Sequence, residues 1–135
     1  MKAAMPCPCG RSLPYEACCG HWHAGAPAPD AESLMRSRYA AYVLKREDYL
    51  LATWSVANRP ERLDLDAAPA PKWTGLEVKR HEATGPDTAI VEFIARYKIG
   101  GRAFRLHETS RFVREAGRWF YVGGDMADDR GRGQV

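Results

Sequence analysis

Residues 88–99 read TAIVEFIARYKI, and this stretch decides the fold. One set of alternate positions is uniformly apolar: Val91, Phe93, Ala95, Tyr97 and Ile99. The opposite set mixes charged and apolar side chains: Ile90, Glu92, Ile94, Arg96 and Lys98. Successive side chains of a strand point to opposite faces of the sheet. The stretch therefore predicts a β-strand whose uniformly apolar face is turned toward the core.

Three further strands are expected around it, at residues 74–83, 103–115 and 118–122. The segments between the strands are Gly85-Pro86-Asp87, Gly100-Gly101 and Ala116-Gly117, which are typical of hairpin turns. The four strands therefore predict an antiparallel meander. The preceding residues 63–71 hold three alanines and two prolines, so they fit either a loop or a weak edge strand.

Two helices are expected before the sheet. Asp30 is suited to cap a helix N-terminus, and Glu32 places an acid in the first turn. Apolar residues then recur at helical spacing to about Leu44, and a second short helix is expected at 48–55. Helices followed by a curved antiparallel sheet predict an α+β domain in which the helices cover one face. The open end of such a cone is a natural pocket.

All four cysteines lie within thirteen residues, as Cys7, Cys9, Cys18 and Cys19. Four thiolates can surround one tetrahedral Zn²⁺, and an all-cysteine set leaves no coordination position open for catalysis. Disulfides are disfavoured, because adjacent Cys18 and Cys19 are hard to join and crossed pairings would strain a short loop. The spacing predicts a structural zinc site. On the residues alone, His21 or His23 could replace Cys19 as the fourth ligand.

The cysteine segment resembles a known motif. Cys-x-Cys-Gly at 7–10, Tyr15 three residues before Cys18, and Cys-Cys-Gly at 18–20 are similar to the SEC-C motif at the C-terminal tail of the bacterial preprotein translocase ATPase. The resemblance implies that Cys19 is the fourth ligand. In the translocase this zinc tail contacts a chaperone and ribosomes. The resemblance therefore implies that the module docks a protein or ribosomal partner.

The rest of the chain resembles a family as well. The segments that carry the likeness are LMRSRY at 34–39, YLLATW at 49–54, VEFIARY at 91–97, HETSRF at 107–112 and GRWFYV at 117–122. They are similar to the YchJ-type family of uncharacterised bacterial proteins, which pairs a SEC-C motif with a domain like nuclear transport factor 2. The resemblance implies a cone of helices over a curved sheet, a fold in which dimers are common.

The proline-rich residues 25–29 are expected to form a linker that packs little. This divides the chain into a zinc module at 1–24, the linker, an NTF2-like domain at 30–124 and a flexible tail at 125–135. No apolar signal segment follows Met1, and the apolar runs are too short to span a bilayer. A cytoplasmic location without membrane contact is therefore expected.

Two polar residues, Glu108 and Ser110, interrupt the apolar face of the 103–115 strand. A carboxylate in an apolar cavity is costly unless paired, and its environment suits general acid or base work. Alternatively, Arg105, Arg111 or a tyrosine hydroxyl could satisfy Glu108, which would then be structural. The expected pocket residues are Glu108, Ser110, Trp54, Trp73, Tyr97 and Tyr39.

Two classes of function fit these features. The first is a binding or adaptor protein that docks a partner through the zinc module. The second is a small-molecule-binding protein or an enzyme of lyase or isomerase type that uses the pocket around Glu108. We favour the binding protein, because the sequence shows no convincing acid–base pair. Direct nucleic-acid binding is not expected, since the basic residues of the strands alternate between faces and the net charge is only +3.

Overall fold

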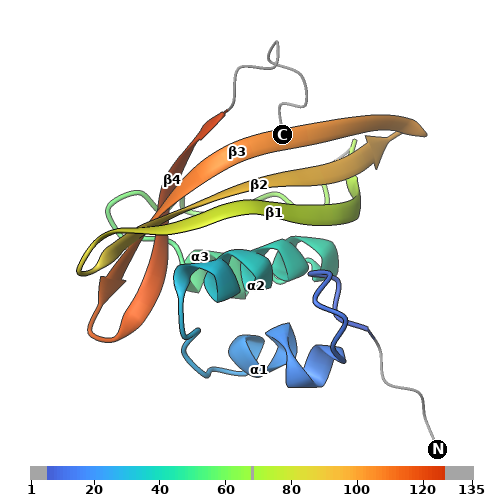
Figure 1. Ribbon diagram of the computed structural model, residues 1–135. Coiled ribbons are helices and arrows are strands. Elements are labelled where there is room, and N and C mark those ends of the chain that lie inside the picture. Colours follow the sequence, from blue (N-terminus) through green and yellow to red (C-terminus); the bar gives the residue numbers. More distant parts are fainter. Residues whose placement is uncertain (1–5, 68, 127–135) are drawn as a thin grey trace, which may run out of the picture.

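The sheet is a four-stranded antiparallel meander with the strand order β1-β2-β3-β4. The computed structural model describes residues 6–67 and 69–126. The strands are β1 (Lys72–Gly85), β2 (Thr88–Ile99), β3 (Arg102–Glu115) and β4 (Arg118–Met126). Figure 1 shows that they form a strongly curved sheet. The predicted meander and its three hairpins are confirmed, although β1 and β4 are longer than expected. The described part of 63–71 contains no strand.

Helix α2 (Ala31–Leu44) crosses the concave face of the sheet, and α3 (Glu47–Ala52) follows it. Asp30 caps α2 as predicted, because its carboxylate accepts a hydrogen bond from the Ser33 amide at 2.7 Å. The helix ends where Lys45 adopts a left-handed conformation with φ 59°.

The second helix is shorter than the predicted 48–55, because the chain leaves it to pair with β4. The Tyr121 amide donates to the Thr53 carbonyl at 2.8 Å, and the Ser55 amide donates to the Tyr121 carbonyl at 2.7 Å. Trp54 forms the isolated bridge to Tyr121 between these bonds. The end of α3 is thereby attached to the last strand.

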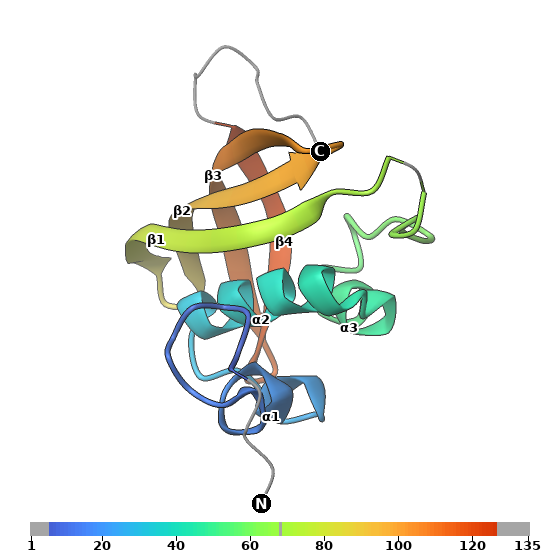
Figure 2. The same ribbon diagram turned by 90° about the vertical axis from the view of Figure 1, so that its right-hand side faces the viewer.

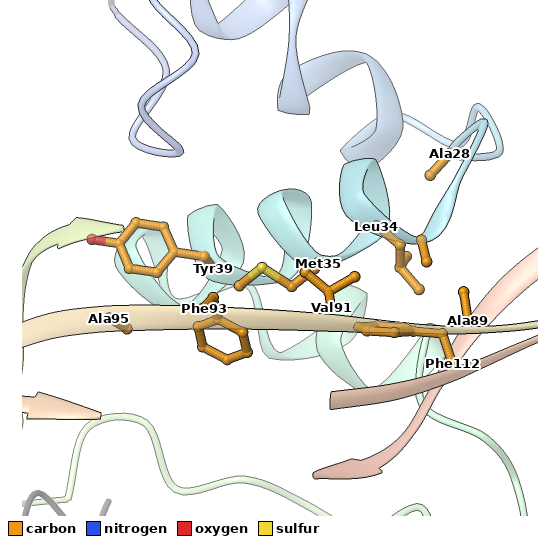
Figure 3. Packing of buried hydrophobic residues seen from close by; sticks show 10 residues of the cluster. Ala28, Leu34, Met35, Tyr39, Ala89, Val91, Phe93, Ala95 and Phe112 are labelled. Carbon is orange, nitrogen blue, oxygen red and sulfur yellow. The ribbon is translucent and has the colours of Figure 1, made fainter. Parts of the chain in front are cut away.

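The main core lies between α2 and β2, as Figure 3 shows. Leu34, Met35 and Tyr39 of the helix pack on the inward side chains of the sheet. The predicted inward set of β2 is buried except for its last member, Ile99, which is half-buried at the strand end. The alternation in the sequence therefore identified the correct face. Ala28 of the expected linker is also buried in this core, so the expectation that the linker packs little is wrong there.

A small N-terminal module forms a further layer on the side of α2 that faces away from the sheet (Figures 1 and 2). It contains a loop, the 3₁₀ turn η1 (Tyr15–Ala17) and the short helix α1 (Cys19–His23). Of the predicted tail at 125–135, the first two residues belong to β4, and residues 127–135 lie outside the described residues. Within the described ranges, no helix is both long enough and apolar enough to cross a bilayer.

Candidate metal centre and ligand pocket

The four cysteine sulfurs converge in the N-terminal module, all within 4.8 Å of one another. Cys7 and Cys9 lie in a tight loop that is closed by a hydrogen bond from the Cys7 amide to the Leu13 carbonyl at 2.9 Å. The Sγ atoms of Cys9 and Cys18 are 3.6 Å apart, and those of Cys18 and Cys19 are 4.0 Å apart. Tetrahedral Zn²⁺ with Zn–S bonds of about 2.3 Å requires sulfurs about 3.8 Å apart. The donor set therefore fits one tetrahedral metal ion.

The centre is closed to solvent, and its thiols influence one another's pKa. The four cysteines are free thiols and only 0 to 6% exposed. Hydrogen bonding from the Cys19 side chain lowers the pKa of Cys9 to about 5, whereas burial raises the pKa of Cys18 to about 11. A metal ion would replace the thiol protons of its ligands, because thiolates are the form that binds metal. A closed set of four sulfurs offers structural support rather than an open catalytic position.

The two histidines next to the cysteines do not join the sulfur group. His21 is exposed. His23 is buried, but its Nε2 donates to the Ser37 carbonyl at 2.8 Å and its Nδ1 accepts from the Tyr15 hydroxyl. Burial also lowers the pKa of His23, which favours the neutral form of the ring. Its role in the described structure is to join the module to α2.

Other contacts fix the module on the same helix. The Arg36 Nη1 donates to the Cys9 carbonyl at 2.9 Å, and the Arg11 Nη1 donates to the Ser33 Oγ at 3.2 Å. Ala40 is fully buried against the sulfur cluster, where its small side chain allows close approach. The metal centre is therefore continuous with the packing of the main domain.

A cavity of about 360 Å³ lies on the opposite side of α2, above the concave face of the sheet. Its walls are mainly apolar and come from α2, the loop at 63–65 and all four strands. Of the six expected pocket residues, four line it: Tyr39, Trp73, Glu108 and Ser110. The other two are absent from the lining. The Trp54 ring packs edge-on against the Tyr121 ring, with 5.1 Å between the ring centres. Tyr97 is buried between the rings of Trp73 and Phe104.

The polar groups of this cavity gather around Glu108. Its Oε2 accepts hydrogen bonds from the Ser110 Oγ at 2.6 Å and the Tyr121 hydroxyl at 3.2 Å. Burial, reinforced by the Glu108 charge, raises the pKa of Tyr121, so its phenol stays protonated and donates. Of the partners expected for Glu108, a tyrosine hydroxyl is therefore found, whereas Arg111 pairs with Asp125 instead at 2.7 Å.

A smaller cavity of about 230 Å³ lies between α1, α3 and the start of β4. Its charged lining includes Arg46 and Asp48, which pair with each other at 3.3 Å, and Arg118. Arg118 donates to the Gly25 carbonyl at 3.3 Å. Because Arg46, Asp48 and Arg118 already bind these partners, the smaller cavity is a weaker candidate for polar ligand contacts than the cavity around Glu108.

Comparison with known proteins identifies the family. A family model described as the YchJ middle NTF2-like domain matches residues 30–124. The chain belongs to the YchJ family. A UPF0225 protein of Methylibium petroleiphilum is 57% identical over 125 residues, which cover 92% of this chain and 90% of that relative.

Two solved structures resemble this YchJ family member over most of its length. The solution structure of a SEC-C motif containing protein from Rhodopseudomonas palustris has a TM-score of 0.80 at 35% identity, and covers 92% of this chain and 100% of that one. The crystal structure of a SEC-C motif containing protein from Psychrobacter arcticus has a TM-score of 0.75 at 30% identity, and covers 97% and 84%. The α+β architecture with an N-terminal cysteine module and an NTF2-like cone is thus shared with them.

The pocket of this YchJ domain also contains a residue that the sequence reasoning missed. Arg38 lines the cavity from α2 and is only 6% exposed. Its Nη1 donates to the Leu50 carbonyl and the Thr53 Oγ1, both at 2.8 Å. The signal was present in the sequence, since Arg38 lies four residues after Leu34 and therefore on the apolar stripe of the helix.

Gly124 was missed too, although it positions Glu108. A Cβ atom at this position would overlap the Glu108 carboxylate, so only glycine lets the carboxylate lie over β4. The signal was the Gly123-Gly124 pair next to a strand pattern, which often marks a close approach of another group to the backbone.

Proposed function

We propose that this YchJ family protein binds a small organic molecule in the cavity on the concave face of its sheet. The observation that carries the proposal is the form of that cavity: about 360 Å³, mainly apolar walls, and polar groups concentrated at Glu108, Ser110, Tyr121 and Arg38. Ligand sites are typically concave and apolar, with a few polar groups that orient the ligand.

The cysteine centre supports this function by holding zinc as a structural ion. Four buried sulfurs with spacings near those of a tetrahedral thiolate site favour Zn²⁺, which prefers such ligands. The module covers the outer side of α2, whose inner side lines the cavity. Zinc would therefore help to hold the helix that forms the pocket wall.

Binding is proposed rather than turnover. Among the described residues, the hydrogen bonds that the Glu108 carboxylate accepts come from Ser110 and Tyr121. A general base for lyase or isomerase chemistry would need a matched acid beside the same substrate atom. Glu108 is accordingly assigned to ligand recognition.

A neutral aromatic probe, 2-naphthamide, tests the pocket. We expect titration to shift backbone amide NMR signals of β2 and β3 around Phe93 and Glu108. The substitution Leu106→Trp fills the cavity and should abolish these shifts. The matched control Ala26→Trp fills the smaller cavity instead and should leave them unchanged. Shifts that survive Leu106→Trp in a folded protein, or no shifts in the wild type, would contradict the proposal.

A second candidate function is docking of a protein or ribosomal partner through the cysteine module. The observation that favours it is Leu13, which is 44% exposed in the loop that the two cysteine pairs anchor. Exposed apolar side chains on a rigid loop are suited to partner contact. Leu13→Ser should then reduce co-sedimentation with ribosomes, whereas Val56→Ser, at a 76% exposed position outside the module, should not. Equal sedimentation of both variants and the wild type would exclude this role for Leu13.

A further inference from the structure

We propose that the ligand of the cavity is a monocarboxylate with an apolar body, and that its carboxylate binds Arg38. This inference rests on the proposed ligand pocket and specifies the chemical class that it takes. The structure places one buried cation, two carboxylates and a large aromatic wall on a single cavity. Each of these features restricts the ligand in a different way.

Arg38 is the feature that favours an anionic ligand. A guanidinium carries five N–H donors and stays charged in proteins. Both hydrogen bonds that Arg38 makes to described residues start from Nη1, and both acceptors are neutral. The Glu108 carboxylate on the same cavity favours the charged form of Arg38, but no carboxylate within the described ranges forms a contact ion pair with it. A buried charge without such a pair is costly, and a ligand carboxylate would supply one.

The surroundings of Arg38 hold its guanidinium in one orientation. Its Cζ lies 4.5 Å from the centre of the Tyr121 ring and 4.9 Å from that of Trp54. The two rings and the two hydrogen bonds fix the side chain, while Nε and Nη2 remain without a hydrogen bond to a described residue. Two neighbouring N–H groups in one plane match the two oxygens of a carboxylate.

The remaining charges on the cavity limit the ligand to a single negative charge. Glu108 lies on the same cavity, and exposed Asp64 lies in the loop that borders it. A dianion such as a phosphate monoester would be repelled by both of these acids. Trp73, Phe93 and Leu106 supply apolar wall for the rest of the ligand. The combination favours a monocarboxylate over a phosphate.

Three probes with the same ring system test the charge directly: 2-naphthoate, 2-naphthamide and 2-naphthyl phosphate. We expect calorimetric titration of the zinc-loaded protein to show naphthoate binding about tenfold or more tightly than the amide, because of the charge-assisted bonds to Arg38. Naphthyl phosphate should bind more weakly than naphthoate. Equal affinity for naphthoate and naphthamide, or tightest binding of the phosphate, would overturn the proposal. Failure of all three probes to bind would instead refute the ligand pocket itself.

Two substitutions test whether Arg38 is the cation that recognises the carboxylate of the ligand. Arg38→Gln should remove the preference for naphthoate over naphthamide, whereas the control Arg96→Gln, which removes one positive charge from an exposed side chain, should keep it. If Arg38→Gln does not fold, Glu108→Gln answers the same question. This change removes a negative charge from the cavity, so the affinity for naphthoate should rise relative to that for naphthamide. An unchanged ratio of the two affinities in a folded Glu108→Gln protein would count against a carboxylate in this cavity.

Discussion

The substitution Cys9→Ser removes one ligand from the sulfur group and should release both the metal and the module. Among the described residues, three hydrogen bonds join the module to α2: His23 to the Ser37 carbonyl, Arg36 to the Cys9 carbonyl and Arg11 to the Ser33 Oγ. At a net value of about 1 kcal/mol each, the domain should lose about 3 kcal/mol of stability. Small domains have about 5 to 15 kcal/mol in total, so the domain should remain folded.

Calorimetry and amide hydrogen exchange measure the two parts of this effect. For a domain of about 100 residues each kcal/mol shifts Tm by roughly 4 to 8 °C, so Tm should fall by about 12 to 24 °C. Exchange protection should disappear at residues 6–24 and persist in β2 and β3. The control Leu13→Ser lies in the same loop, is exposed and is not a ligand, so it should keep metal and Tm. An unchanged Tm, or loss of protection throughout the sheet, would refute the reasoning.

Three further changes probe other parts of the molecule. Gly124→Ala should displace the Glu108 carboxylate, which heteronuclear NMR of the Glu108 side chain would detect; an unmoved carboxylate would contradict the packing. Burial lowers the pKa of His23 below its ordinary value of about 6.5, so stability should fall as the pH drops below that value, because the unfolded state binds the proton. Melts at pH 7.5 and 5.5 should show a smaller difference for His23→Gln than for the wild type. Leu34→Ala leaves a cavity in the core and should lower the free energy of unfolding, measured with denaturant, by about 2 to 5 kcal/mol. A smaller loss would show that the core relaxes around the cavity.

The sheet was largely predictable because its signals are local. Alternation in residues 88–99 identifies the inward face, and glycine-containing turns separate the strands, so the meander follows without tertiary information. The grouping of the four cysteines was equally informative, since few arrangements of such closely spaced thiols exist other than a shared metal. The end of α3 was less predictable. It is set by pairing of Trp54 with Tyr121, which is distant in the sequence.

The pocket was predicted only in part, because its lining depends on how distant elements meet. Glu108 was found because it interrupts an apolar face, whereas Arg38 is a charged residue on a helix that also carries exposed charges. Its burial results from α3 and β4, which supply two acceptors and two aromatic rings around it. Tyr97 has the inward direction that the alternation predicts, but neighbouring aromatic rings separate it from the cavity. Burial and access to a cavity are different properties, and a strand pattern predicts only the first.

The most direct test of the account is a crystal structure of the zinc-loaded protein with 2-naphthoate bound. The naphthalene ring should lie between α2 and the concave face of the sheet, with the carboxylate oxygens within hydrogen-bond distance of Arg38. Naphthoate bound only in the smaller cavity, or a carboxylate directed into solvent with Arg38 unengaged, would contradict the proposed site.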